Sequence, residues 1–263
     1  MPYVPQFGVE TPPNKTVIWR YLDLPKLLIL IEQSSLYFAL TKELEDEWEA
    51  VLSRKVRAKI AYFAPAVSGA IVHSFQDFCK HVGINCWHID ESESIAMWSL
   101  YTSWKPSTEA NCYGTAIKSD VGRLKSCFER SQEKIVIGEV IYVDHSNDFW
   151  DQSPLDGTNA FEPIYQKRTC FRHEKELRAA TVIVPESHSG YPVQGQSIQI
   201  NLDLLIDSVV LCPNFPAWSK ALIESAASRA NIKLNICESE IPMHPSARGL
   251  GEDSIDDLSE PRH

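Results

Sequence analysis

Short runs of β-branched and aromatic residues recur along the chain between helical segments of uneven length, and this pattern constrains the fold most strongly. Residues 16–22 (TVIWRYL) predict a strand, because such side chains suit a pleated, half-buried surface. Asp23 suits the N-cap of a following helix and Pro25 its first turn, so we expect a helix that ends near Gln33. Residues 36–39 predict the next strand. Strands and helices that mix without strict alternation favour an α+β fold, in which a single domain has a central mixed, partly antiparallel sheet flanked by helices.

The same signals predict the remaining elements. Further strands are expected at 84–89, 113–118, 133–143, 177–184, 198–200, 208–211 and 233–237. Helices are expected at 92–101, 122–130, 217–230 and within 50–82, with an interruption near Pro65 and Gly69 and a C-cap at Gly83. The strand–helix–strand unit at 208–237 predicts an added edge of the same sheet.

The domain organisation is expected to be simple. Residues 1–15 predict an extended N-terminal arm, 16–243 a single α+β domain, and 244–263 a disordered tail. The polar connection from 144 to 161 is long enough to be either functional or mobile.

Charge limits the classes of partner. The formal net charge of the 263 residues is -10, which argues against broad electrostatic binding of nucleic acid. A local basic groove remains open, since 53–59 and 167–178 are basic, although 53–59 is more typical of the solvated face of a helix. Nucleic acid is therefore not the expected partner, although it is not excluded, and a small-molecule nucleotide is a possible one.

Cysteine use and the N-terminus predict the compartment. The seven cysteines are odd in number and contain no CxxC pair, so buried, reduced thiols are expected. The N-terminus lacks the pattern of a signal peptide, and the most apolar stretch, 27–31, is too short to span a bilayer. We expect a cytoplasmic protein that does not enter a membrane.

The densest cluster of charge runs from Lys167 to Arg178. If 174–184 is one strand, Glu174, Glu176 and Arg178 share a face with Ala180 and Val182, and that face leads into the core. Charges at the mouth of a core must be paired or line a wet cleft. Two interpretations stay open: a structural ion-pair cluster that includes Lys167 or Arg168, and a Glu-x-Glu strand that binds and activates a polar ligand.

Four other residues could serve a ligand. Trp98 and Tyr101 share a helix face, which is more typical of core than of a ligand platform. Gly114 begins a strand, where it indicates close approach of a neighbour or a ligand. Arg20 lies in an apolar strand and must face water, a carboxylate such as Glu174 or Glu176, or a ligand phosphate.

Several common chemistries lack their motifs. The chain contains no Gly-x-Gly-x-x-Gly or Walker loop and no Gly-x-Ser-x-Gly elbow. The histidines show no metal-ligand spacing, and the pairs 144–145 and 173–174 would splay to opposite strand faces. We therefore name no metal ligands, although a metal-dependent nuclease that uses Asp144 and the two glutamates remains an alternative.

The chain resembles a mostly bacterial family known as domain of unknown function 2971. The resemblance covers most of the chain and is carried by WRYL at 19–22, GTAIK at 114–118, VIYVD at 140–144, and the pattern KR…FxxExExR at 167–178. That last pattern is the most specific. The resemblance implies no activity, but members of the family often look like phage-defence or abortive-infection genes.

The order of key residues is also similar to that of arginine-serine-glutamate ADP-ribosyltransferases. That similarity implies that Arg20 anchors the phosphates of NAD, that Glu176 is the catalytic carboxylate, and that Glu174 orients the acceptor. The chain departs from those enzymes at the middle strand, which lacks a Ser-Thr-Ser motif and has Gly114 and Thr115 instead.

Three hypotheses follow. In the first, the protein is an NAD-consuming transferase or glycohydrolase with Glu176 and Glu174 as catalytic residues. Its ligand would be bound by Arg20, Trp98, Tyr101, Gly114, Lys167, Arg168 and Arg178. In the second, the same charges bind a nucleotide or phosphate ligand without turnover. The third is the nuclease.

Overall fold

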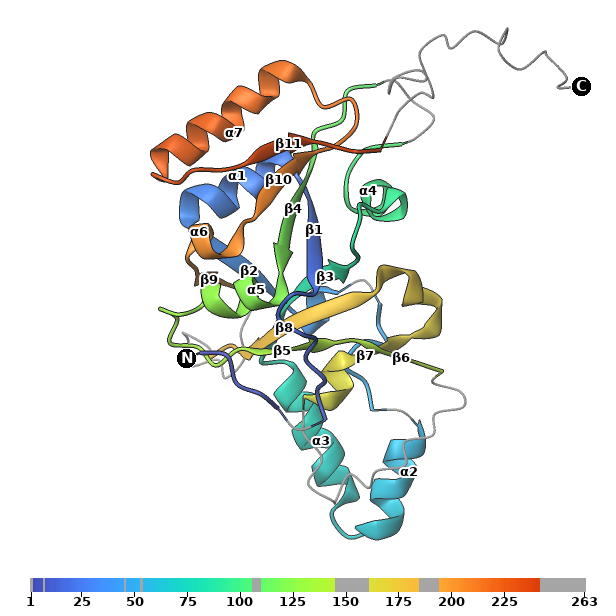
Figure 1. Cartoon of the computed structure of the whole chain (residues 1–263). Helices are drawn as coiled ribbons and strands as arrows, with labels where there is room; N and C mark the ends of the chain where they lie inside the picture. The colour runs from blue at the N-terminus through green and yellow to red at the C-terminus, as the bar shows by residue number, and fades with distance from the viewer. Residues whose placement is uncertain are drawn as a thin grey trace, which may run out of the picture.

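The computed structural model describes residues 2–6, 8–44, 46–52, 54–105, 110–144, 161–184 and 194–241, which form a single α+β domain (Figure 1). The strands are β1 Val17–Asp23, β2 Ser35–Leu40, β3 Val82–Ile89, β4 Gly114–Asp120, β5 Val136–Glu139, β6 Ile141–Val143, β7 Gln166–Arg168, β8 Glu176–Val182, β9 Gln196–Gln199, β10 Ser208–Leu211 and β11 Ile236–Glu238. The α-helices are α1 Leu24–Gln33, α2 Arg54–Phe63, α3 Ser68–Cys79, α4 Ile95–Tyr101, α5 Val121–Cys127, α6 Leu202–Leu205 and α7 Ala217–Arg229. Short 3-10 helices are η1 Thr41–Glu43, η2 Glu162–Tyr165 and η3 Thr169–Glu174.

Nine strands of the described residues form one sheet. Its order is β11-β10-β4-β1-β3-β2-β9, with β8 beside β3 and β5 beside β8. All neighbours are antiparallel except β10 and β11, which are parallel and joined by α7, as predicted for the added edge. β6 and β7 form a separate parallel pair. The prediction of a mixed, partly antiparallel sheet flanked by helices is confirmed.

The sheet splits at β3, and this split positions the candidate site. β8 pairs along one edge of β3. The other edge is shared: β1 pairs with its end at His88 and Ile89, and β2 pairs with its start at Gly83 and Ile84. No strand of the described part of the chain pairs with this edge at 85–87, so β1 and β2 diverge there.

Local sequence explains how β1 and β2 are joined. Asp23 accepts a hydrogen bond from the Lys26 backbone amide at 2.9 Å, which is the predicted N-cap of α1. Ser34 ends the helix in the left-handed conformation at φ 47°, and β2 begins at the next residue. Leu27 and Ile31 of α1 are fully buried in the main core, so the helix is fixed beside the split.

The main core lies between the sheet and the helices α1, α5, α6 and α7. Burial of each of its large apolar side chains contributes about 1.5–3 kcal/mol relative to exposure. A second cluster packs α4 against β1, with Trp98 fully buried and its ring 4.9 Å from that of Tyr21. α4 is therefore held close to the split as well.

Two sequence predictions about strands and caps are wrong. The segment 133–143 is not one strand, because the chain leaves the large sheet at Val140 and continues as β6 in the small sheet. Gly83 does not cap a helix but lies in β3, where a Cβ atom would come within 2.6 Å of Ile183 Cδ1 and 3.0 Å of Phe38 Cβ. Close packing, rather than a turn, requires glycine there.

The strand predicted at 174–184 is also corrected. Lys175 adopts the left-handed conformation at φ 40°, so Glu174 belongs to η3 and β8 begins at Glu176. Ala180 is fully buried, as expected, but Val182 is 42% exposed because β8 has reached the end of the sheet.

Some predictions fall outside the described residues, namely most of the connection 144–161 and the tail 244–263. The N-terminal residues that are described include Tyr3, which bridges to Ile135, and Val4, whose amide donates to the Ile135 carbonyl at 2.9 Å. Within the described ranges, no helix combines the length and the apolar character that crossing a membrane requires.

Candidate functional site

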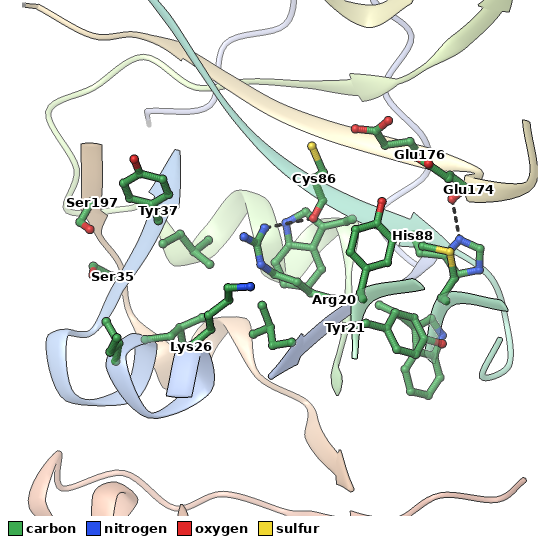
Figure 2. Close-up of a pocket in the computed structure, with 18 of the residues that line it drawn as sticks. Arg20, Tyr21, Lys26, Ser35, Tyr37, Cys86, His88, Glu174, Glu176 and Ser197 are labelled. Atoms are coloured by element: carbon green, nitrogen blue, oxygen red, sulfur yellow. Dashed lines mark hydrogen bonds between the residues drawn. The ribbon is translucent and has the colours of Figure 1, made fainter. Parts of the chain in front are cut away.

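A cleft of about 480 Å³ opens where β1 and β2 diverge (Figure 2). This volume lies within the range of about 300–1,000 Å³ that is typical of ligand sites. β1, α1 and β2 supply one part of the lining, β3 crosses beneath it, and η3 and β8 supply the carboxylates Glu174 and Glu176. The split of the sheet thus brings the predicted arginine strand and the predicted glutamates to one cavity.

Arg20 is a half-buried cation that projects into this cleft (Figure 2). Its Nη1 donates to the Cys86 carbonyl at 3.0 Å, which is an oxygen that the divergence of β1 and β2 leaves without a strand partner. The guanidinium carbon lies 5.8 Å from the centroid of the Trp87 ring, and the buried Nε has no hydrogen-bond partner. Among the residues that the structure describes, no carboxylate forms an ion pair with Arg20.

The environment of Arg20 therefore favours an anion. Burial lowers the pKa of Arg20 from its ordinary value, yet arginine stays charged at neutral pH. Lys26 of α1 also lines the cleft, although it is largely exposed and its Nζ lies 3.0 Å from Asp23. A half-buried cation that faces a cavity and has no acidic partner among the described residues favours the binding of a phosphate or carboxylate there.

Glu176 and Glu174 form the acidic wall of the cleft (Figure 2). Glu176 accepts hydrogen bonds from Nε and Nη2 of Arg178 at 2.8 and 3.0 Å, and from Nζ of Lys167 at 3.2 Å. Glu174 accepts from the same Nζ at 2.6 Å. Burial acts to raise the pKa of Glu176, but the Arg178 charge and hydrogen bonds, together with Lys167, outweigh it and lower that pKa to about 2.

Lys167 and Arg178 lie behind this wall as buried cations. Arg178 is fully buried and also donates to Glu49, whose other carboxylate oxygen is 3.3 Å from Lys167 Nζ. We call Glu49, Lys167, Glu174, Glu176 and Arg178 the buried charge cluster. Its three carboxylates face two cations, so it carries one formal negative charge in excess.

The other predicted ligand residues divide in two. Tyr101 lines the cleft. Burial, and to a smaller extent the negative charge of Glu174, raises the pKa of its phenol, so the phenol stays protonated. Trp98 does not line the cleft but donates from Nε1 to Glu93 at 2.9 Å. Gly114 lies outside the cleft too, and the neighbour that requires glycine there is Thr102, whose Cβ would lie 2.7 Å from an added Cβ.

Arg168 forms a two-pronged ion pair with Asp46, with both distances 2.9 Å, instead of joining the buried charge cluster.

Sequence reasoning missed His88 and Glu49. His88 lines the cleft, and its Nδ1 lies 2.6 Å from the Glu174 carbonyl, so it fixes the backbone of the acidic wall. Its Nε2 has no hydrogen-bond partner and lies 3.8 Å from Asp90 Oδ2. Residues 43–49 are acidic and residues 167–178 are basic, so the two runs have complementary charge in the sequence. That complementarity is the one signal that could have pointed to Glu49.

Acidification from about pH 7 to about pH 5 is expected to destabilise the fold through His88. Burial lowers the pKa of His88 from its ordinary value of 6.5, so the unfolded chain binds this proton more readily than the folded protein. The stability that neutral His88 contributes is thus present above about pH 6.5 and is lost as the pH falls below it. Glu176, with its pKa near 2, contributes a separate loss only at still lower pH.

Thermal unfolding across this pH range checks the prediction. His88→Asn keeps a side-chain N–H for the Glu174 carbonyl and cannot take up a proton. The variant should therefore lose most of the dependence on pH, and a slope equal to that of the wild type would assign the effect to other groups.

The geometry bears on the nuclease hypothesis through the carboxylates themselves. The oxygens of Glu174 and Glu176 are bound by Lys167 and Arg178, which compete with any cation for them. In the described part of the chain, no three His, Cys, Asp or Glu side chains are grouped so that they could hold a metal ion.

Comparison with known proteins gave no match among protein-family models, curated proteins or solved structures. The resemblance to domain of unknown function 2971 and the similarity to ADP-ribosyltransferases therefore stay predictions from the sequence.

Proposed function

We propose that the cleft binds NAD and that the protein cleaves the bond between nicotinamide and ribose. The observation that carries this proposal is that Arg20, which pairs with no carboxylate of the described residues, lies in one cavity with Glu174 and Glu176. NAD has two anionic phosphates and a cationic nicotinamide ring, so its charges complement those of the cleft. Aromatic residues in the lining, such as Tyr21, Trp87 and Tyr101, offer surfaces for flat rings.

The chemistry requires a fixed negative charge. When the bond between the ribose C1′ and the ring nitrogen breaks, its electron pair neutralises the ring, and positive charge develops on the ribose. A carboxylate that is ionised at every physiological pH stabilises this charge, and Glu176 meets that condition. Attack by water then gives ADP-ribose and a proton, whereas attack by an acceptor hydroxyl or amine gives the ADP-ribosylated acceptor and a proton.

The roles of the neighbouring residues follow from their contacts. Arg178 and Lys167 hold Glu176 in place and keep it ionised, so we assign them positioning roles. Arg20 would bind a phosphate, and Tyr101 would contact the ligand from α4. A role in phage defence, which the family resemblance implies, belongs to the same proposal, because NAD loss arrests the metabolism of an infected cell.

Incubation of the purified protein with NAD tests the proposal directly. Release of nicotinamide, measured by chromatography, and a mass increase on any co-purified acceptor are the expected results. NAD that stays intact after long incubation, with no modified species, would overturn the enzymatic proposal.

A second candidate is a module that binds a nucleotide without turnover. The observation that favours it is the tight pairing of Glu176 with Arg178 and Lys167, which is also what a purely structural cluster would show. NAD or another nucleotide would then raise the melting temperature without being consumed.

Arg20→Gln is expected to abolish the thermal stabilisation by NAD. A ligand at about 100 times its Kd stabilises a protein by about 2.7 kcal/mol, so the shift in the wild type is measurable by calorimetry. Arg229→Gln on α7 is the matched control, because Arg229 is an exposed arginine that pairs with Glu32 and does not line the cleft. If NAD still raises the melting temperature of Arg20→Gln by the wild-type amount, the ligand binds elsewhere. NAD should raise the melting temperature of Arg229→Gln as much as that of the wild type, and a smaller shift in this control would mean that the effect is not specific to the cleft.

A further inference from the structure

The helices α2 and α3 form a hairpin that extends away from the sheet (Figure 1). Its interior is small: Leu52, Val56 and Ile60 are buried, with Ile71, Val72 and Phe75 partly buried against them. The hairpin therefore uses the apolar face of α2 for its own packing. The opposite face of α2 is left to solvent.

The segment that forms the hairpin is basic in sequence. Residues 54–81 contain five lysines and arginines and one aspartate, a net charge of +4 in a chain whose net charge is -10. Arg57 is exposed, and among the described residues it has no carboxylate partner; its Nε donates to the Leu52 carbonyl at 2.8 Å. A basic segment in a strongly acidic protein is a local feature that the net charge conceals.

Aromatic side chains lie at the end of the same helix. Tyr62 is 80% exposed and Phe63 is 58% exposed, with their ring centroids 5.1 Å apart in an edge-to-face arrangement. Exposed aromatic rings on a helix of basic sequence suit the stacking of unpaired bases, and each stacked base contributes about 1–3 kcal/mol.

We infer that the α2–α3 hairpin binds single-stranded nucleic acid, with Arg57 contacting the phosphate backbone and Tyr62 and Phe63 stacking against bases. An anionic membrane is the less suitable partner. A helix that lies in a membrane must bury its apolar face in lipid, and the apolar face of α2, at Val56 and Ile60, is 1% and 2% exposed. The inference does not depend on what the cleft binds.

Fluorescence anisotropy with a labelled oligothymidylate of about 20 nucleotides tests the inference in the full chain. We expect binding that weakens as salt is raised, since bound phosphates release counterions. Arg57→Glu should weaken binding by about fivefold or more and should reduce the salt dependence. Arg229→Glu on α7 makes the same change in net charge at an exposed site elsewhere, so it should leave binding within about twofold.

A second variant protects the test against misfolding. Tyr62→Ala changes a side chain that is largely in solvent, so it should keep the melting temperature of the wild type and still weaken binding. The inference is overturned if the wild type does not bind the oligonucleotide, or if Arg57→Glu and Arg229→Glu bind equally. Selective binding to phosphatidylserine vesicles, or a dimer that Tyr62→Ala dissociates, would also overturn it in favour of a membrane or a second copy of the chain.

Discussion

Replacing Glu176 by glutamine is expected to slow NAD cleavage by about 100-fold or more, because the fixed charge opposite the developing ribosyl cation is removed. The fold should survive the change. The buried charge cluster has one negative charge in excess, so the loss of one carboxylate leaves two carboxylates and two cations in balance. Glutamine keeps an oxygen that can accept from Arg178, although its amide nitrogen faces donors and costs about 1–3 kcal/mol of stability.

Glu174→Gln is the matched control for this prediction. It makes the same chemical change in the same cluster, at a residue that also binds Lys167. If Glu176 is the stabilising carboxylate and Glu174 orients the acceptor, Glu174→Gln should retain hydrolysis of NAD within about tenfold and should impair transfer to an acceptor more strongly. Equal losses of hydrolysis in the two variants would show that only the total charge of the cluster matters, and would remove the specific role of Glu176.

Replacing Arg178 by methionine is expected to cause the largest loss of stability, about 3–5 kcal/mol. Arg178 is fully buried between Glu176 and Glu49. Methionine fills much of the space but leaves the carboxylates of the buried charge cluster with Lys167 as their one remaining cation. Buried carboxylates without counter-charges are costly, and a loss of this size lowers the melting temperature by about 6–20 °C.

Arg229→Met controls for the chemical change itself. Arg229 pairs with Glu32 on the surface, with both side chains more than half exposed, and such pairs contribute about 0–1 kcal/mol. Calorimetry or chemical denaturation of both variants measures the contrast. Similar small losses in the two would mean that the buried charge cluster contributes little to the fold, and that its role is confined to the cleft.

The elements that sequence could predict are those set by local signals. β1 and α1 were predictable because β-branched residues, the Asp23 cap and Pro25 all lie within a few residues of the boundary they define. The charged segment after Lys167 was predictable as a special region for a similar reason, since charges within an otherwise apolar pattern stand out in one dimension.

The remainder depends on contacts between distant residues. Apart from the acidic run in which it lies, nothing near Glu49 indicates that it will bind Arg178, because the pairing joins residues 129 positions apart and becomes evident only once the sheet has formed. The break at Val140 was equally hidden: the alternating pattern runs through it, and the change of sheet arises from tertiary pairing with β7. Glu174 reaches the cleft from a 3-10 helix because Lys175 takes a left-handed backbone conformation that its residue type does not suggest.

The split of the sheet at β3 also determines how the cleft can change its width. Where β1 and β2 diverge, the gap is bridged by side chains: Arg20 donates to the Cys86 carbonyl, and Asn85 Nδ2 donates to the Tyr37 carbonyl at 2.9 Å. Each such bond contributes about 0.5–1.5 kcal/mol, far less than a continuous ladder of backbone hydrogen bonds. The separation of β1 and β2 at this point therefore depends on two side-chain hydrogen bonds and not on a strand pair. A ligand anion that replaced the Cys86 carbonyl as the partner of Arg20 would break one of these two bonds and leave every strand pair of the sheet in place.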